Sequence, residues 1–156
     1  MRRIILEKFI RRVFERYHSY KAEYELYQSL RKNIPDSARG QNKDLKLLEV
    51  KLTAITGWLG LLNEGEAFVV QHHMIEGISW PRMVIVYQER WGLKTARTER
   101  MLKTYQANAL QKIAEFNEAH MDIIGNLFGD LLVDDGGGDD DQCAECAVQQ
   151  NHYAKR

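Results

Sequence analysis

A run of basic and hydroxyl side chains between residues 94 and 104 has the chemistry to contact phosphates and the edges of bases. Arg97, Arg100 and Lys103 follow one another at intervals of three, so on a helix they stay on one broad face. Arginine can donate two parallel hydrogen bonds to guanine, and lysine or threonine can reach phosphate oxygens. Glu99 is the one carboxylate in this run. An ordinary solvated basic face has the same pattern, so spacing alone leaves both interpretations open.

Other residues with chemical potential form weaker patterns. His72 and His73 are adjacent and diverge by about 100 degrees on a helix, which disfavours a shared metal site and favours packing. Cys143 and Cys146, with His152, could be half of a zinc site completed by a second subunit, but their glycine- and aspartate-rich surroundings favour an exposed pair without metal. We find no phosphate loop, nucleophile elbow or pair of catalytic acids in the sequence, and therefore expect neither an enzyme nor a cofactor.

The first 62 residues predict a pair of helices. From Leu6 to Tyr27 the apolar and aromatic positions are spaced alternately by four and three, which predicts one long helix. A seam with the same spacing runs from Leu45 to Leu62, after a segment rich in turn residues. Two matched seams joined by a loop of about a dozen residues predict an antiparallel hairpin. Because exposed heptad seams readily pair, we expect the hairpin to mediate homo-oligomerisation or a contact with RNA polymerase.

Helix boundaries are marked clearly after residue 62. Asn63 and Glu66 have the spacing of a capping box, and Gly77 suits the left-handed residue that follows a helix. Ser79 is a candidate N-cap, with Pro81 in the first turn of the helix that follows. These signals predict a short helix, a turn around residue 77, and a second helix from residue 79.

The second of these helices is expected to end near Trp91, before Gly92. Its β-branched residues 83–87 would also suit a buried strand, but the signals at both ends favour a helix. A longer helix follows, with an apolar side made of Met101, Leu102, Tyr105, Ala109, Ile113 and Phe116. Its opposite polar side carries Arg97, Arg100, Lys103, Thr104, Ala107 and Gln111. This succession of a helix, a turn, a short helix, a connector and a basic helix is the order of a helix-turn-helix unit.

Two stretches resemble the region-4 helix-turn-helix of bacterial sigma factors. Residues 62–80 have leucine and glutamate at the helix start, an apolar pair and a Glu-Gly-x-Ser turn, and residues 109–113 read Ala-Leu-Gln-Lys-Ile. A helical segment before such a unit is similar to phage and mobile-element transcription regulators of the ArpU and RinA kind. The resemblance covers about a third of the chain. It departs at residues 82–84, which read Arg-Met-Val where the sigma pattern has an acidic residue and Ile-Ala, and in a connector longer by about two helical turns.

Together these observations predict an all-α protein with a helical hairpin at 1–62, a helix-turn-helix domain at 63–120, and a short helix with a disordered acidic tail at 121–156. The resemblance implies a sequence-specific transcriptional regulator that reads the major groove of double-stranded DNA with the helix around residues 96–113. The alternative is an all-helical protein–protein adaptor that does not bind DNA. The expected DNA contacts, whose register is open by one turn, are Ser79, Trp80, Arg82, Lys94, Arg97, Thr98, Arg100, Lys103 and Thr104.

The charge is balanced overall but divided along the chain. The 22 basic and 22 acidic residues cancel, which taken alone argues against nucleic acid. Residues 1–113 carry 20 basic and 12 acidic residues, a net charge of +8, whereas residues 114–156 carry 2 and 10, a net charge of −8. The acidic tail is hypothesised to compete with DNA for the basic helix; a solubilising appendage is the alternative.

The sequence also bears on where the protein works. No apolar run approaches the roughly 20 residues that span a bilayer. Glu7 and Lys8 interrupt the N-terminal segment before an apolar stretch of signal-peptide length develops. We therefore expect a cytoplasmic protein without a membrane partner.

Overall fold

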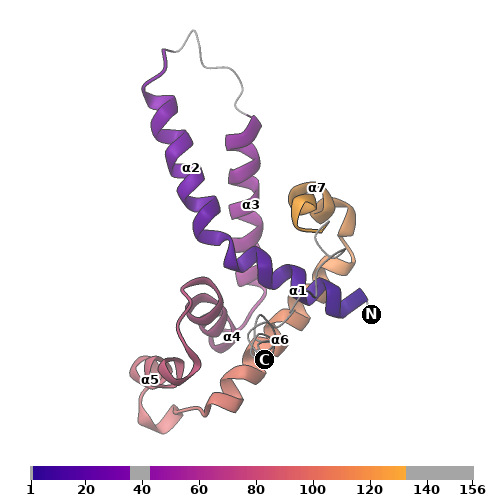
Figure 1. The fold of residues 1–156 in the computed structure, drawn as a ribbon. Helices are drawn as coiled ribbons and strands as arrows, with labels where there is room; N and C mark the ends of the chain where they lie inside the picture. Colours follow the sequence, from indigo (N-terminus) through magenta and orange to yellow (C-terminus); the bar gives the residue numbers. More distant parts are fainter. Residues whose placement is uncertain (1, 36–42, 133–156) are drawn as a thin grey trace, which may run out of the picture.

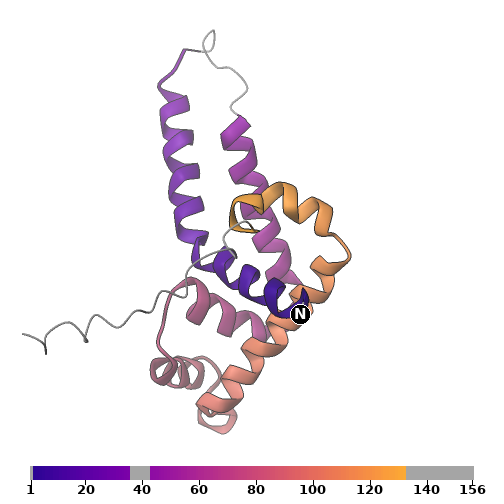
Figure 2. The same cartoon turned by 45° about the vertical axis from the view of Figure 1, so that its right-hand side comes forward.

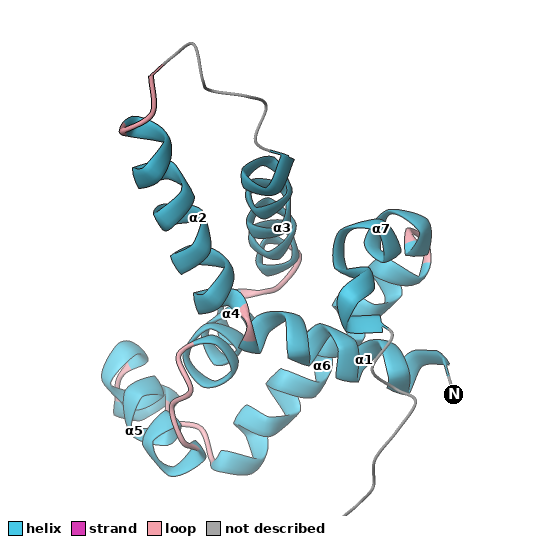
Figure 3. Ribbon diagram, turned by 45° about the horizontal axis from the view of Figure 1, so that its top comes forward, coloured by secondary structure: helices cyan, strands magenta, loops and turns pink. Residues whose placement is uncertain are grey.

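The computed structural model describes residues 2–35 and 43–132, and within these residues the chain is helical without strands, which confirms the predicted all-α fold (Figure 3). The proposed tail and the Cys143–Cys146 pair lie outside the described residues. The elements in chain order are α1 (Arg2–Glu15), α2 (Tyr17–Lys32), α3 (Lys43–Gly60), α4 (Glu64–Val69), the π-helix η2 (Val70–Ile75), α5 (Trp80–Trp91), the 3₁₀ turn η3 (Leu93–Thr95), α6 (Glu99–Glu118) and α7 (Met121–Leu132).

The predicted long N-terminal helix is two helices. The backbone leaves helical geometry at Arg16, with φ −88° and ψ 0°, and α1 and α2 run in different directions (Figure 1). Phe9 and Phe14 lie off the predicted seam, and both are buried together with Ile10. They give α1 an apolar face too wide for one partner helix. As a result α1 packs into the body of the protein, against α6, α7 and η2.

The helices α2 and α3 pack side by side and run in opposite directions, as an arm that projects from the body (Figures 1 and 2). Tyr20 of α2 and Leu48 of α3 are buried, and Tyr24 and Tyr27 pack against the same core. The heptad pattern of the first 30 residues therefore packs against two different partners. Its first part, in α1, packs into the body of the protein, and its tyrosines, in α2, pack against α3.

The larger of two apolar cores lies where α1, α2, α3, η2, α6 and α7 meet. Phe128 of α7 is fully buried at its centre, and its ring centroid lies 6.0 Å from Phe9, 5.8 Å from Trp58 and 6.2 Å from Tyr20. The Lys51 ammonium lies 5.7 Å from the Phe128 ring centroid, an arrangement that keeps a buried cation on an aromatic face. This core joins residues from both sides of the predicted boundary at residue 62.

The smaller core holds α4, α5 and the first half of α6 together. Its fully buried members are Val69, Met83 and Leu102, with Tyr87 6% exposed, and half-buried aromatic residues surround them. The helix α6 therefore contributes to both cores, Leu102 to the smaller and Ile113 to the larger.

The local signals after residue 62 are confirmed. The Asn63 side-chain oxygen accepts a hydrogen bond from the Glu66 amide at 2.8 Å, and the Glu66 carboxylate accepts one from the Asn63 amide at 3.2 Å, which completes the capping box. Gly77 and Gly92 have φ values of +73° and +87°, the left-handed region that glycine adopts without strain. Segment 83–87 is helical, within α5, and Ser79 occupies its N-cap position without a side-chain capping bond.

Candidate nucleic-acid interface

The helix α6 presents one polar side of its first three turns to solvent. Thr98 caps it by accepting a hydrogen bond from the Met101 amide at 3.3 Å. Leu102, Ala109 and Ile113 on the inner side are fully buried. Residues 100–111 contain no aspartate or glutamate, and their exposed polar and small side chains are those of Arg100, Lys103, Thr104, Ala107, Asn108 and Gln111.

Two expected members of the apolar side face solvent instead. Met101 is 43% exposed and Phe116 is 45% exposed. The reason is geometric, because the buried stripe of α6 follows Leu102, Gln106, Ala109, Leu110, Ile113, Ala114 and Asn117. Positions 101 and 116 lie beside this stripe.

The carboxylates next to this polar side are both engaged. Glu99 lies 2.6 Å from the Lys103 ammonium, in an exposed pair one turn apart. Glu115 accepts a hydrogen bond from the Gln111 side chain at 3.0 Å. The Thr104 hydroxyl donates to the Arg100 carbonyl at 3.0 Å, which leaves the hydroxyl oxygen free to accept.

A stack of three side chains connects α5 to α6. The Trp80 ring lies on the His73 ring with centroids 3.8 Å apart, and the Lys103 ammonium lies 5.6 Å from the Trp80 centroid. The His73 Nδ1 atom is 2.7 Å from the Ile78 carbonyl oxygen. Because a carbonyl can only accept, Nδ1 carries the proton. Trp80, an expected DNA contact, is thus half-buried as a packing residue that positions Lys103.

Arg97 precedes α6 and is occupied within the protein. Its guanidinium donates to the Tyr105 hydroxyl at 3.1 Å and to the carbonyls of Thr95 and Ala96 at 3.1 and 3.3 Å. The hydrogen bond to Tyr105 raises the pKa of Arg97 above its ordinary value. These bonds fix the connector between α5 and α6, so Arg97 is a positioning residue in this conformation.

The remaining expected contacts lie on the surface around α5 and the connector. Ser79 and Arg82 are exposed at the start of α5, and Lys94 is exposed in η3. Residues 79–113 contain 7 basic and 2 acidic residues, a net charge of +5. The helices α5 and α6 with their connector therefore form the basic part of this half of the molecule.

An ion pair between a buried carboxylate and a half-exposed lysine holds α6 against α4, and the sequence did not reveal it. The Lys112 ammonium donates to both Glu66 carboxylate oxygens, at 2.9 and 2.8 Å, and Glu66 is only 3% exposed. The sequence identified Glu66 as a capping residue and Lys112 as part of the Ala-Leu-Gln-Lys-Ile stretch at residues 109–113, which resembles sigma region 4. The two residues are 46 positions apart, and no spacing rule connects them.

The two histidines make separate contacts. His72 Nδ1 lies 2.7 Å from a Glu76 carboxylate oxygen, whereas His73 stacks on Trp80. In the described part of the chain, no three His, Cys, Asp or Glu side chains gather as a metal site would require.

Among residues 2–35 and 43–132, no helix combines the length and apolar character needed to cross a bilayer. Comparisons of the chain with protein-family models, with curated proteins and with solved structures find no match.

Proposed function

We propose that this protein binds double-stranded DNA and reads its sequence with the first three turns of α6 in the major groove. The observation that carries the proposal is the exposed side of α6, which offers cations, amides and a hydroxyl over residues 100–111 without a carboxylate. The major groove is about 12 Å wide and admits one helix. A carboxylate on that side would be repelled by the phosphates that line the groove.

The side chains suit different parts of a duplex. Arg100 is the first choice for a base contact, because an arginine can bond guanine through two atoms. Asn108 and Gln111 carry amides that match adenine, and Ala107 offers a methyl group to thymine. Lys103 is placed for a phosphate.

The residues around α5 suit the DNA backbone. Ser79, Arg82 and Lys94 are exposed next to the basic helix and would contact phosphates on either side of the groove. Thr98 and Arg97 would act indirectly, since one caps α6 and the other fixes the connector. A role in transcription, a phage or mobile-element setting and RNA polymerase as a partner rest on the resemblance to sigma region 4.

Binding to a pool of random-sequence duplexes tests the proposal. Selection from the pool followed by fluorescence anisotropy on the enriched sequence should show affinity that falls steeply with salt, by about 0.9 in log K per log salt for each phosphate contact. Arg100→Ala should weaken binding to the enriched sequence by about 1–3 kcal/mol. Arg100→Lys should keep non-specific binding and lose the preference for that sequence, because lysine keeps the charge and lacks the two-atom bond.

Lys21→Ala is the matched control, since it removes one exposed cation from α2, away from the basic helix. It should leave affinity almost unchanged. If Arg100→Ala and Lys21→Ala weakened binding equally, or if no sequence were enriched, the assignment of α6 as the helix that reads DNA would be incorrect. The alternative of a protein–protein adaptor would then be favoured.

A further inference from the structure

The helix α3 carries a second seam that the fold leaves open. Leu45, Leu48 and Ile55 of its first seam are buried inside the protein. A different set of positions, again spaced by three and four, consists of Leu47, Val50, Ala54 and Gly57 on the outer side of the helix and of Leu61 just after its end. Ala54 is partly buried at the edge of the larger core. Leu47, Val50 and Leu61 are 40%, 39% and 42% exposed. Its partners in the structure, α2 and α7, leave this outer side of α3 partly open.

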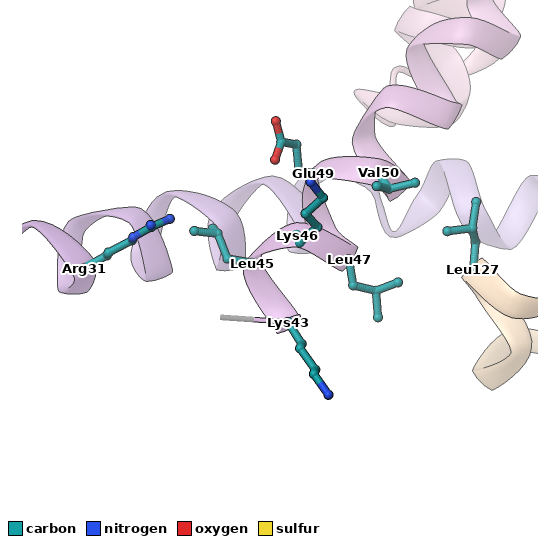
Figure 4. A pocket seen from close by; sticks show the side chains of 8 residues that line it. All are labelled: Arg31, Lys43, Leu45, Lys46, Leu47, Glu49, Val50 and Leu127. Atoms are coloured by element: carbon teal, nitrogen blue, oxygen red, sulfur yellow. The ribbon is translucent and has the colours of Figure 1, made fainter. Parts of the chain in front are cut away.

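Two hollows border this outer seam. The first, of about 590 Å³, is lined by Leu47 and Val50 of α3 and by Leu127 of α7, together with charged residues (Figure 4). The second, of about 320 Å³, is lined by Ala54, Gly57 and Leu61, again with Leu127, and by the exposed residues Phe116 and Ile123. Because both include Leu127, they form one surface along α3 and α7, which is partly charged at the first hollow and apolar at the second; we call it the α3–α7 face.

The middle of the α3–α7 face is shaped for another helix. Ala54 and Gly57 are small, and a Cβ atom placed on Gly57 would have nothing within 4 Å. Small residues between larger ones let a second helix approach closely. Asn117 at the wall of the second hollow is fully buried, and neither polar atom of its side chain has a hydrogen-bond partner among the described residues.

The charges at the two ends point to a second copy as the occupant. Arg31, Lys43 and Lys46 line the first hollow against a single acid, Glu49. At the other end, the exposed acids Glu118 and Asp122 are next in sequence to lining residues of the second hollow. A two-fold axis through the middle of the face would place the basic end of each copy on the acidic end of the other, twice over.

The remaining segment of this chain fits less well. Residues 133–156 contain only Val133, Val148 and Tyr153 as large apolar residues, and they are acidic. They could complement the basic end of the α3–α7 face but not its whole apolar length.

We infer that the α3–α7 face is a self-association surface, on which two copies pack antiparallel through the outer seam of α3 and around Gly57. This surface differs from the heptad seams of residues 6–27 and 45–62, from which oligomerisation was predicted, because those seams pack within the protein. The inference does not depend on DNA binding, because it is measured without DNA.

Sedimentation velocity of the full chain over a range of concentrations tests the inference. The wild-type protein should show the mass of two chains. Gly57→Arg should raise the dissociation constant about 100-fold or more, because it places an unpaired charge in the centre of the interface. Its Cβ has open space and a helical glycine is replaced, so the monomer fold should persist by circular dichroism. Thr56→Arg adds the same charge one residue away, at an exposed position that lines neither hollow of the α3–α7 face, and should leave the dimer intact.

A charge reversal checks the antiparallel arrangement. Lys43→Glu with Lys46→Glu should weaken the dimer, and adding Glu118→Lys with Asp122→Lys in the same chain should restore it. A wild-type chain that stays single at all concentrations, or equal loss with Gly57→Arg and Thr56→Arg, would overturn the self-association surface. Failure of the reversal to restore the dimer would overturn the antiparallel packing.

Discussion

The larger and the smaller core bury their groups in different ways. The larger core surrounds Phe128 with aromatic and aliphatic side chains from five α-helices and from η2. The smaller core has four buried apolar residues, and polar contacts hold its margin: Arg97 with Tyr105, His73 with Ile78, and Glu66 with Lys112. The contrast suggests that one core supplies most of the stability, and that the other holds a surface in place.

The helix α6 connects the two cores. Most of the candidate interface lies on the first half of α6, which packs in the smaller core. Regions with few buried apolar contacts open locally at lower free energy than the whole fold. Arg100 and Lys103 are therefore expected on a part of α6 that can open while residues 109–114 stay packed. The following changes test this difference, from the largest expected effect to the smallest.

Phe128→Ala should lower the free energy of unfolding by about 3–5 kcal/mol, because it empties the centre of the larger core. Urea unfolding followed by circular dichroism measures the loss. Phe128→Leu retains part of the volume and should cost less. If Phe128→Ala cost under 1 kcal/mol by the same measurement, the larger core would not be the main source of stability.

Met83→Ala should lower stability by about 2–3 kcal/mol, because Met83 is fully buried in the smaller core. Hydrogen exchange should show the largest loss of protection in α5 and the first half of α6, with less loss in α1. Ile85→Ala, at a site on the same helix that is 47% exposed, should change stability by less than about 0.5 kcal/mol. Uniform loss of protection through all helices would show that the two cores unfold as one.

Lys112→Met should cost about 1–2 kcal/mol, since it leaves the buried Glu66 carboxylate without its cation; the half-exposed lysine moderates the loss. Glu66→Gln in the same chain should recover part of it. Lys103→Met breaks the exposed pair with Glu99 and should cost less than about 0.5 kcal/mol. If Lys112→Met and Lys103→Met lowered stability equally in urea unfolding, the Glu66–Lys112 ion pair would contribute no more to stability than an exposed ion pair.

Glu76→Gln should have the smallest effect on the free energy of unfolding, and that effect should disappear at acid pH. Burial acts to raise the Glu76 pKa, but hydrogen bonds from His72 and Gln71 and the charge of His72 lower it below its ordinary value of 4.5. A lowered folded-state pKa contributes stability that is present above the unfolded value and is lost as pH falls through the folded value. Because Glu76 is exposed, the contribution is under about 0.5 kcal/mol.

Urea midpoints at about pH 6 and about pH 3, spanning the carboxyl range, should therefore differ less in Glu76→Gln than in the wild type. A larger difference in the variant would contradict the stated direction of the shift.

The sequence predicted the features that arise from neighbouring residues. The capping box at Asn63, the turns at Gly77 and Gly92, and the polar side of α6 depend on short-range geometry, and each was predicted at its residue. The break at Arg16 has no glycine or proline to mark it, because it results from competition for the wide apolar face of α1.

The same limit applies to the candidate site. The polar side of α6 follows from helical spacing, but the bonds of Arg97 to Tyr105 and of Lys112 to Glu66 depend on how α4, α5 and α6 pack. The outer seam of α3 was equally hidden, because only the structure shows which of its two seams is already covered.

The most direct test of the central claim is a nuclear magnetic resonance titration of the ¹⁵N-labelled chain with a mixed-sequence duplex at low salt. We predict shifts of the amides of residues 98–111 and of the first turn of α5, reversed by added salt, with the amides of α2 unchanged. An unperturbed spectrum, or shifts confined to α2 and α3, would contradict α6 as the helix that binds DNA.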